Sequence, residues 1–348
     1  MLRVAMLTGI AVLGLALLLL LAIIALRVIL AFQQRRQQRV VAHCQPLLLQ
    51  ALEQALPEIP VLSKAERIIV LNLWRQLHES LRGPALEKLN AIGRSFDFDA
   101  LARELLLSRN VRDQLVGIAT AGLLRDKRAW DAVSRYAQSP NPAISLTAAH
   151  SMLQIDPEAG LAQLLPDIAA RADWPVAGIA TMLAEVGPDR ATVPLMRAAI
   201  QCARAADAAQ SAPRLLRLLE LTHLGGATAT ARYILVSNPG EATIAAALRL
   251  LRDPQDLPLL RRYCTHPNWA VRVQVAHALG RLGTGQERAL LVDMLGDPNW
   301  WVRYRAAQGL AALPFVTIGE LKVLQQGSAD RFAADMLTQV IAEREAAA

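Results

Sequence analysis

Apolar residues recur at helical spacing along most of the chain, and the alternating pattern of a half-buried strand is absent from the sequence. The segments 257–263 and 287–295 show this spacing, with apolar residues three and four positions apart. Prolines and glycines separate such segments and mark the joints between them. The pattern predicts an all-α protein built from short helices.

The strongest pattern is a repeat of 31 residues. The sequence HPNWAVR at 266–272 returns as DPNWWVR at 297–303, so Asn268 and Asn299 are one period apart. Each copy continues into an apolar helical stretch. Self-similarity at a fixed period is the signature of a stacked repeat fold, because a two-helix unit cannot bury its apolar face alone.

Further copies extend the repeat in both directions. Asp330 follows Asn299 by one period, and Asn110 and Asn141 are separated by the same distance. Weaker copies begin near three other positions, Trp174, Ala212 and Glu241. We therefore predict about eight or nine helix pairs over 63–348.

The starts of the helices carry capping signals. Asn or Asp stands directly ahead of the second helix of each clear copy and is suited to bind its free amides. Ser63 and Glu66 fit a capping box at the start of an early helix. The glycine-rich segment 280–285 follows a helix and is interpreted as a helix C-cap and turn, and Asp97 as the cap of a helix beginning near Phe98.

The repeat resembles a known family. The pattern Asp-Pro-x-x-x-Val-Arg-x-x-Ala-Ala-x-x-Leu at 297–310 is similar to HEAT repeats, specifically the short type found in phycobilisome lyases. The resemblance is strong over 260–345 and moderate over 105–155. It implies a right-handed α-solenoid that binds partner proteins, in which Arg272 and Arg303 link adjacent units through polar contacts.

The N-terminal segment has a different composition. Residues 4–26 contain no charge and would span about 34 Å as a helix, enough for a hydrocarbon core of about 30 Å. We predict a transmembrane helix within 1–32, a connector over 33–62 and the solenoid over 63–348. A cleaved signal peptide is the alternative, but the apolar run is longer than such peptides use.

Charge beside this segment predicts its orientation. Arginines are in excess on its C-terminal side, which favours a single-pass inner-membrane protein with the solenoid in the cytoplasm. These arginines are candidates for contact with lipid head groups, although a solvated helix exit explains them equally well: Arg27, Arg35, Arg36 and Arg39.

The overall charge adds little to this picture. The chain of 348 residues has a net charge of +7, and its basic residues comprise 33 arginines and four lysines. The arginines are dispersed and interleaved with acids, which argues against nucleic-acid binding. The three cysteines, Cys44, Cys202 and Cys264, have unrelated spacings and predict no disulfide framework.

The search for catalytic motifs is negative. The sequence contains no zinc-binding His-Glu-x-x-His or Cys-x-x-Cys, no phosphate-binding loop and no nucleophile elbow. Deoxyhypusine hydroxylases resemble this architecture but bind iron through His-Glu pairs, whereas Val-Gln and Tyr-Arg stand at 273–274 and 304–305. We therefore expect no enzyme activity, catalytic residue, metal or cofactor.

A surface for a protein partner remains. Aromatic residues and arginine, which interface centres favour, gather near the starts of the second helices: Trp269, Trp300, Trp301, Tyr304 and Arg305. Alternatively, these tryptophans fill the groove between repeats. Trp301 is the better docking candidate, because the sister repeat has Ala270 in its place.

These observations predict a membrane-tethered scaffold or adaptor that docks a membrane or membrane-associated protein. Residues 4–26 would hold it in the lipid bilayer, as an accessory subunit of a bacterial inner-membrane complex in envelope polysaccharide synthesis, transport or signalling. Two alternatives remain. One is a tetrapyrrole-lyase-like or other cofactor-handling HEAT protein, and the other is a periplasm-facing anchored solenoid that binds envelope ligands.

Overall fold

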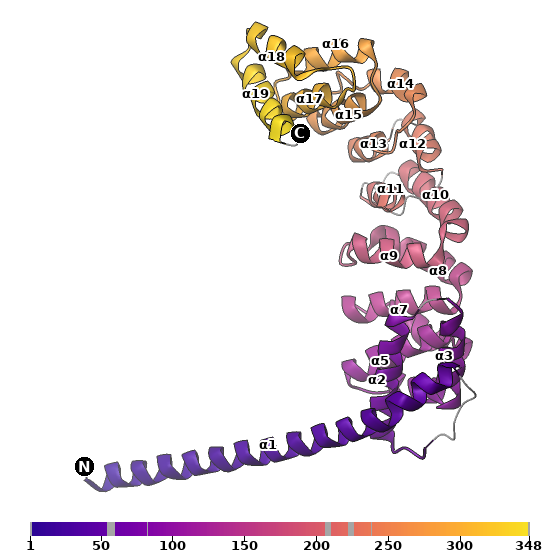
Figure 1. Ribbon diagram of the computed structural model, residues 1–348, viewed down its shortest axis with the longest axis vertical. Helices are drawn as coiled ribbons and strands as arrows, with labels where there is room; N and C mark the ends of the chain where they lie inside the picture. The colour runs from indigo at the N-terminus through magenta and orange to yellow at the C-terminus, as the bar shows by residue number, and fades with distance from the viewer. Residues whose placement is uncertain are drawn as a thin grey trace. The chain divides into compact units, whose positions relative to one another are not determined.

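The computed structural model describes residues 2–53, 60–81, 83–205, 210–221, 226–237 and 239–346, without the side chains of 2–16, 29, 30 and 33. Helices are the only regular structure in these ranges, and no strand occurs among them (Figure 1). The predicted all-α class is therefore confirmed. The chain divides into two compact units, Met1–Ile155 and Asp156–Ala348.

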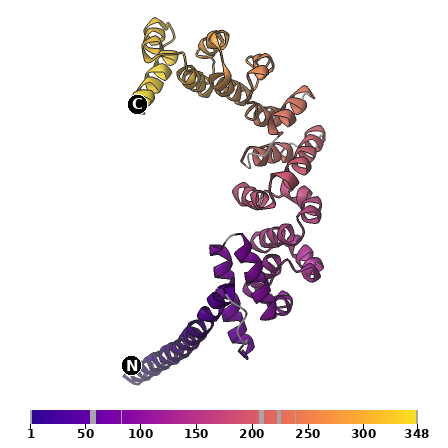
Figure 2. The same cartoon turned by 45° about the vertical axis from the view of Figure 1, so that its right-hand side comes forward.

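The first unit begins with a long helix that the other helices contact only near its end. The N-terminal part of α1 projects from the rest of this unit (Figure 1 and Figure 2). The elements in order are α1 (Leu2–Glu53), α2 (Lys64–Ser80), α3 (Pro84–Ser95), α4 (Phe98–Leu106), α5 (Val111–Leu124), a 3-10 turn η1 (Lys127–Ala129), α6 (Trp130–Ala137) and α7 (Pro142–Ile155).

Trp74 forms the centre of the core in the first unit. Its side chain is fully buried, and its indole N–H donates to the carbonyl of Leu89 over 2.7 Å. The ring meets Phe98 edge-on at 5.8 Å between centroids. Cys44 and Leu48 of α1 are buried in the same cluster, so the C-terminal part of α1 belongs to this core.

The second unit is a succession of helix pairs. Its elements are α8 (Pro157–Ala170), α9 (Val176–Val186), α10 (Pro188–Arg204), α11 (Ser211–Leu221), α12 (Ala227–Val236), α13 (Glu241–Leu248), η2 (Pro254–Asp256), α14 (Leu257–Arg261), α15 (Trp269–Leu282), α16 (Gly285–Met294), α17 (Trp300–Ala312), α18 (Ile318–Gly327) and α19 (Arg331–Ala346). The second helices α13, α15, α17 and α19 pack against one another in chain order (Figure 1). This stacking fits an α-solenoid, and its right-handed sense stays a prediction.

The predicted caps are present at the repeat boundaries. The side chains of Asn110, Asn268 and Asn299 each accept a hydrogen bond from the second amide of the following helix. Ser63 and Glu66 form the predicted capping box at the start of α2. α15 ends at Leu282 inside the glycine-rich segment, as predicted.

Asp97 does not cap α4 through its side chain, contrary to the prediction. It precedes the helix in the left-handed conformation, with φ of 53°, and its carboxylate makes no cap hydrogen bond. Its backbone carbonyl instead accepts from the Leu101 amide and from the Arg67 guanidinium at 3.0 Å each. The turn geometry therefore uses the backbone of Asp97 where the sequence indicated its side chain.

Arg272 links neighbouring repeats through polar contacts, as the resemblance implied, whereas Arg303 reaches the next repeat through an aromatic ring. The Arg272 guanidinium donates to both carboxylate oxygens of Asp297, from Nε over 2.6 Å and from Nη2 over 2.8 Å. The guanidinium of Arg303 lies over the Phe332 ring of the next repeat, 5.1 Å from its centroid. These two arginines therefore join α15 to the start of the α17 repeat, and α17 to α19.

The predicted transmembrane helix over 4–26 and the single-pass membrane localisation are corrected by the structure. Among the described residues, no helix carries an apolar stretch that is long enough to cross a membrane. The described apolar run is 17–26, which as a helix covers about 15 Å, half of a hydrocarbon core of about 30 Å. The side chains of residues 4–16 lie outside the described part. The segment limits at 32 and 62 stay a prediction.

Candidate docking surface

The predicted docking tryptophans stand at open helix ends. Trp269 is the first residue of α15, and Trp300 is the first of α17, each directly after its Asn cap. A side chain in a helix leans toward the N-terminus, so at the first position no preceding turn covers it. The side chains of Trp269, Trp300 and Trp301 are accordingly exposed to 45%, 48% and 42%.

Another tryptophan of the repeats, Trp174, differs from these three. Trp174, which lies near the start of α9, is fully buried, and the Arg171 guanidinium covers its ring at 4.8 Å. Trp174 therefore belongs to the core, whereas the three tryptophans of the C-terminal repeats lie at the surface. Only the C-terminal repeats expose theirs, although the repeat position is similar.

Trp300, Trp301 and Tyr304 form one aromatic cluster on α17. The two indole rings stack with centroids 3.9 Å apart and an angle of 28° between their planes. The Tyr304 ring lies 6.5 Å from each of them. Stacking holds both large apolar side chains in place before any partner is bound.

Hydrogen bonds fix the polar side of this cluster against α19. The Tyr304 hydroxyl donates to a Glu343 carboxylate oxygen over 2.9 Å and accepts from the Gln308 amide over 2.8 Å. Arg305 donates to the Gln308 side-chain oxygen over 2.7 Å. Partial burial and the neighbouring carboxylate of Glu343 raise the pKa of Tyr304, so its hydroxyl is protonated at neutral pH.

Basic residues that the sequence did not single out lie beside this cluster. His277 is exposed on α15, and its pKa is lowered by partial desolvation and by the guanidinium groups of Arg281, Arg305 and Arg249, against a smaller opposite effect of Glu220. The sequence carries one signal for two of these residues, Arg249 and His277, which share a position in their repeats with Gln308 of α17. Arg249, His277 and Gln308 each stand nine positions after the cap of their helix, at Gly240, Asn268 and Asn299.

The arginines of α1 belong to the first unit, whereas the aromatic cluster belongs to the second. Arg27, Arg35, Arg36 and Arg39 are all exposed. Arg36 donates to the Ser63 hydroxyl over 2.8 Å and pairs with Glu66 at 3.2 Å, which ties α1 to the capping box of α2. The contact of these arginines with lipid head groups was predicted from charge beside a membrane span. Because that span is not found among the described residues, the contact stays a prediction without structural support.

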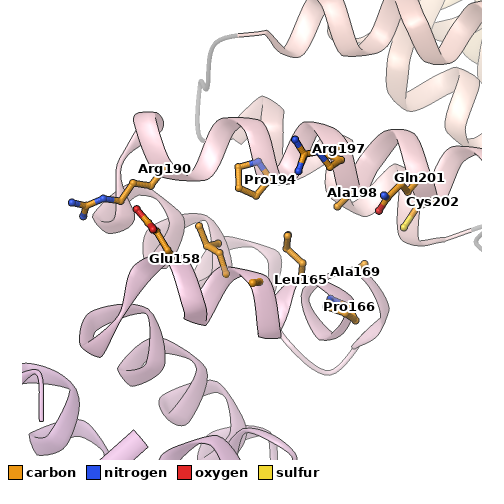
Figure 3. A pocket seen from close by; sticks show the side chains of 12 residues that line it. Glu158, Leu165, Pro166, Ala169, Arg190, Pro194, Arg197, Ala198, Gln201 and Cys202 are labelled. Atoms are coloured by element: carbon orange, nitrogen blue, oxygen red, sulfur yellow. The ribbon is translucent and has the colours of Figure 1, made fainter. Parts of the chain in front are cut away.

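An open cavity of about 540 Å³ lies between α8 and α10 (Figure 3). Its lining is mainly aliphatic, with Leu165, Pro166 and Pro194 on facing helices. Arg190 and Arg197 stand along the α10 side, and neither makes an ion pair with a described residue. None of the predicted docking residues lines this cavity.

The described residues offer little reactive chemistry. Among them, no three His, Cys, Asp or Glu side chains are grouped so as to hold a metal ion. The three cysteines are unpaired thiols. Burial raises the pKa of Cys264 to about 11, which keeps this thiol protonated and a poor nucleophile at neutral pH.

Comparison with known families agrees with this architecture. Residues 237–311 match the family model for HEAT repeats, a range that contains α13 to α16, all of α17 but its last residue, and all five predicted docking residues. The match and the all-helical structure support a HEAT-repeat protein, and a HEAT repeat suggests a scaffold for protein interaction. The match does not extend to the phycobilisome-lyase type. No curated protein matches the chain.

Proposed function

We propose that this protein is a non-catalytic scaffold that docks a protein partner on the surface formed by Trp300, Trp301, Tyr304 and Arg305, with Trp269 beside it. One observation carries the proposal: a stacked pair of tryptophans stands about half exposed on a capped helix end. A water-exposed apolar pair of this size is unfavourable unless another surface covers it.

The composition and rigidity of this surface support the proposal. Tryptophan, tyrosine and arginine are the residues that most often dominate the binding energy of protein interfaces. Because stacking and the hydrogen bonds of Tyr304 already order these side chains, binding loses little conformational entropy.

The partner proposed is a protein and no nucleic acid. The centre of this surface is a stacked pair of large apolar rings, and such a pair suits the apolar side chains of a protein partner. The proposed partner is one member of a larger assembly in which this protein serves as an accessory subunit.

The test is a comparison of crosslinked partners in the producing cells. The full chain and its Trp300→Ala/Trp301→Ala variant are crosslinked in cells, and attached proteins are quantified by mass spectrometry. We expect specific proteins to be lost with the double variant, since two interface tryptophans contribute about 2–4 kcal/mol each, a weakening of at least about 30-fold.

Phe315→Ala provides the matched control. Phe315 is 44% exposed, lies between α17 and α18 and is outside the aromatic cluster. This variant is expected to keep the wild-type set of partners, and both variants should keep the wild-type melting temperature. If the double variant retains every crosslinked protein, the proposed docking surface is wrong.

A further inference from the structure

A positively charged face adjoins the aromatic cluster on the second helices. Arg281, near the end of α15, donates to the carbonyls of Arg249 and Leu251 over 3.3 Å and 3.1 Å, which brings it against the end of α13. Arg305 lies on the neighbouring α17, and its charge acts on His277 of α15. Three consecutive second helices therefore each contribute one guanidinium group to this face, which we call the arginine face: Arg249, Arg281 and Arg305.

Among the described residues, acids balance the positive charge of the arginine face only in part. The carboxylate that acts on His277 is that of Glu220 on α11. Glu220 is already shared between two arginines, at 3.1 Å from Arg249 and 2.7 Å from Arg217. Arg281 binds backbone carbonyls, and Arg305 binds a glutamine, so neither is paired with an acid there. Like charges held this close repel one another, and an anionic partner removes that repulsion.

We infer that the segment docked on this surface is acidic: a stretch of the partner protein whose Asp or Glu side chains meet the arginine face while an apolar side chain contacts Trp301. This inference rests on the proposed docking function and names its partner by charge. Guanidinium groups suit the recognition of carboxylates, because each offers several donors in one plane.

The size of the surface indicates how long the segment is. Packed helices lie about 8–10 Å apart, so the path from α13 across α15 and α17 to α19 covers roughly 25–30 Å. An extended chain rises about 3.3 Å per residue and therefore needs about eight or nine residues for this distance. A short extended segment with several acids is sufficient to reach from Arg249 to the aromatic cluster.

The experiment uses two labelled peptides and the full chain. One fluorescein-labelled peptide of about nine residues alternates glutamate with leucine, and its match carries glutamine in place of glutamate. Fluorescence anisotropy measures binding at about 50 mM salt. We expect the glutamate peptide to bind at least about tenfold tighter than the glutamine peptide, and this difference to shrink at about 500 mM salt because ions screen the charges.

Charge-reversal variants localise the effect. Arg305→Glu, alone and with Arg281→Glu, is expected to weaken binding of the glutamate peptide by about tenfold or more. If Arg281→Glu disturbs the fold because Arg281 loses its contacts with the backbone carbonyls, Arg305→Glu alone still tests the proposal. Arg190→Glu/Arg197→Glu on α10 changes the net charge as much as the double variant and should leave binding nearly unchanged.

The outcomes separate this inference from the proposed function. Equal binding of both peptides, no binding of either, or equal weakening by the α10 control would overturn the acidic partner. If Trp300→Ala/Trp301→Ala still removes partners in cells while the charge reversals have no effect there or on the peptide, the docking function stands and the acidic partner is wrong. If Trp300→Ala/Trp301→Ala removes no partner in cells and the charge reversals do not weaken peptide binding, the docking function itself is contradicted.

Discussion

Among the described acids of the repeats, Glu287 has the most strongly lowered pKa. Its side chain is fully buried at the start of α16, where it accepts from the Thr284 hydroxyl over 2.5 Å and the Thr284 amide over 2.8 Å. The Arg261 guanidinium of α14 donates to it over 3.0 Å. Burial alone would raise the pKa of Glu287, but these hydrogen bonds and the charge of Arg261 lower it to about 2. One carboxylate thus caps its own helix and joins two repeats.

Glu287→Gln is expected to destabilise the protein by about 2–3 kcal/mol, because Arg261 then loses its acid. The folded pKa of Glu287 is lower than its ordinary value of 4.5, so its contribution is present above pH 4.5 and is lost as the pH falls toward about 2. Urea unfolding at several pH values checks both points. Glu320→Gln, in the exposed capping box of α18, serves as the control and should cost less. An unchanged stability of Glu287→Gln at neutral pH would contradict this account.

His277 makes the proposed docking sensitive to pH. The groups that face it are Arg281 on its own helix, Arg305 on α17, Arg249 after α13 and Glu220 on α11. Because partial desolvation and the arginines lower its pKa below the ordinary 6.5, His277 is neutral at neutral pH. An acidic segment beside it would raise this pKa, so binding takes up a proton and tightens as the pH falls.

The peptide assay measures this effect directly. Binding of the glutamate peptide should tighten by a few fold between about pH 7.5 and about pH 5.5, a range in which glutamates remain ionised. In His277→Gln this extra gain should disappear while binding at the higher pH stays similar. A variant that keeps the full pH dependence would show that His277 is not the group that titrates.

At the residue scale, the sequence predicts the positions of the exposed tryptophans but not which residues surround them, and their docking role stays a prediction. The repeat places Trp269, Trp300 and Trp301 at helix starts, and the structure has them there and exposed. The repeat gave no reason for Trp174 to be buried, since burial depends on the helices that pack over it. The arginine face was likewise not predicted, because α13, α15 and α17 bring its members together only after they stack.

At the scale of elements, second helices approach closely at one recurring position. A Cβ on Gly280 of α15 would collide with the Cα of Gly309 on α17, and a Cβ on Gly122 of α5 would lie 2.7 Å from the Cα of Ser151 on α7. Gly280 and Gly122 both stand twelve positions after the Asn cap of their helix. The same contact therefore occurs in both units, and only a residue without a side chain fits there.

Gly280→Ala is expected to destabilise the protein by about 1–3 kcal/mol, because the added methyl group meets backbone that cannot turn aside. The midpoint of urea unfolding measures this. Gly285→Ala at the start of α16 is the matched control, since nothing lies within 4 Å of its Cβ. Alanine favours helix more than glycine does, so this control should be neutral or slightly stabilising. Equal midpoints for the two variants would contradict the close approach.

First helices are joined by a second set of contacts that the sequence did not indicate. Arg103 of α4 pairs with Asp126, Arg232 of α12 with Asp256 and Arg261 with Glu287, and in each pair the acid belongs to the following repeat. Their separations of 23, 24 and 26 residues differ from the period of 31. A search for one fixed period finds the Asn caps and misses these pairs, because the arginine and its acid occupy different positions within their repeats.

At the scale of the whole molecule, the repeats form two compact units where the sequence suggested one run over 63–348. The clear copies lie at 110–141 and at 268–330, one group in each unit, and the copies between them are weak. A period shows that repeats follow one another but not how strongly each pair of neighbours adheres. That strength depends on the side chains at each junction, such as Arg272 with Asp297.

Because repeats contact mainly their nearest neighbours, we expect a destabilising substitution in one unit to increase local opening in that unit alone. In a repeat protein the stability is a sum of repeat and junction terms, so a weakened junction opens its own neighbours first. Hydrogen exchange followed by mass spectrometry should show faster exchange for Gly280→Ala across α13 to α19 and wild-type rates over 60–155. Gly122→Ala provides the reciprocal variant, with faster exchange over α4 to α7 and wild-type rates in α15 to α19. If either variant accelerates exchange equally in both units, the chain unfolds as one cooperative body and the division at Ile155 has no energetic meaning.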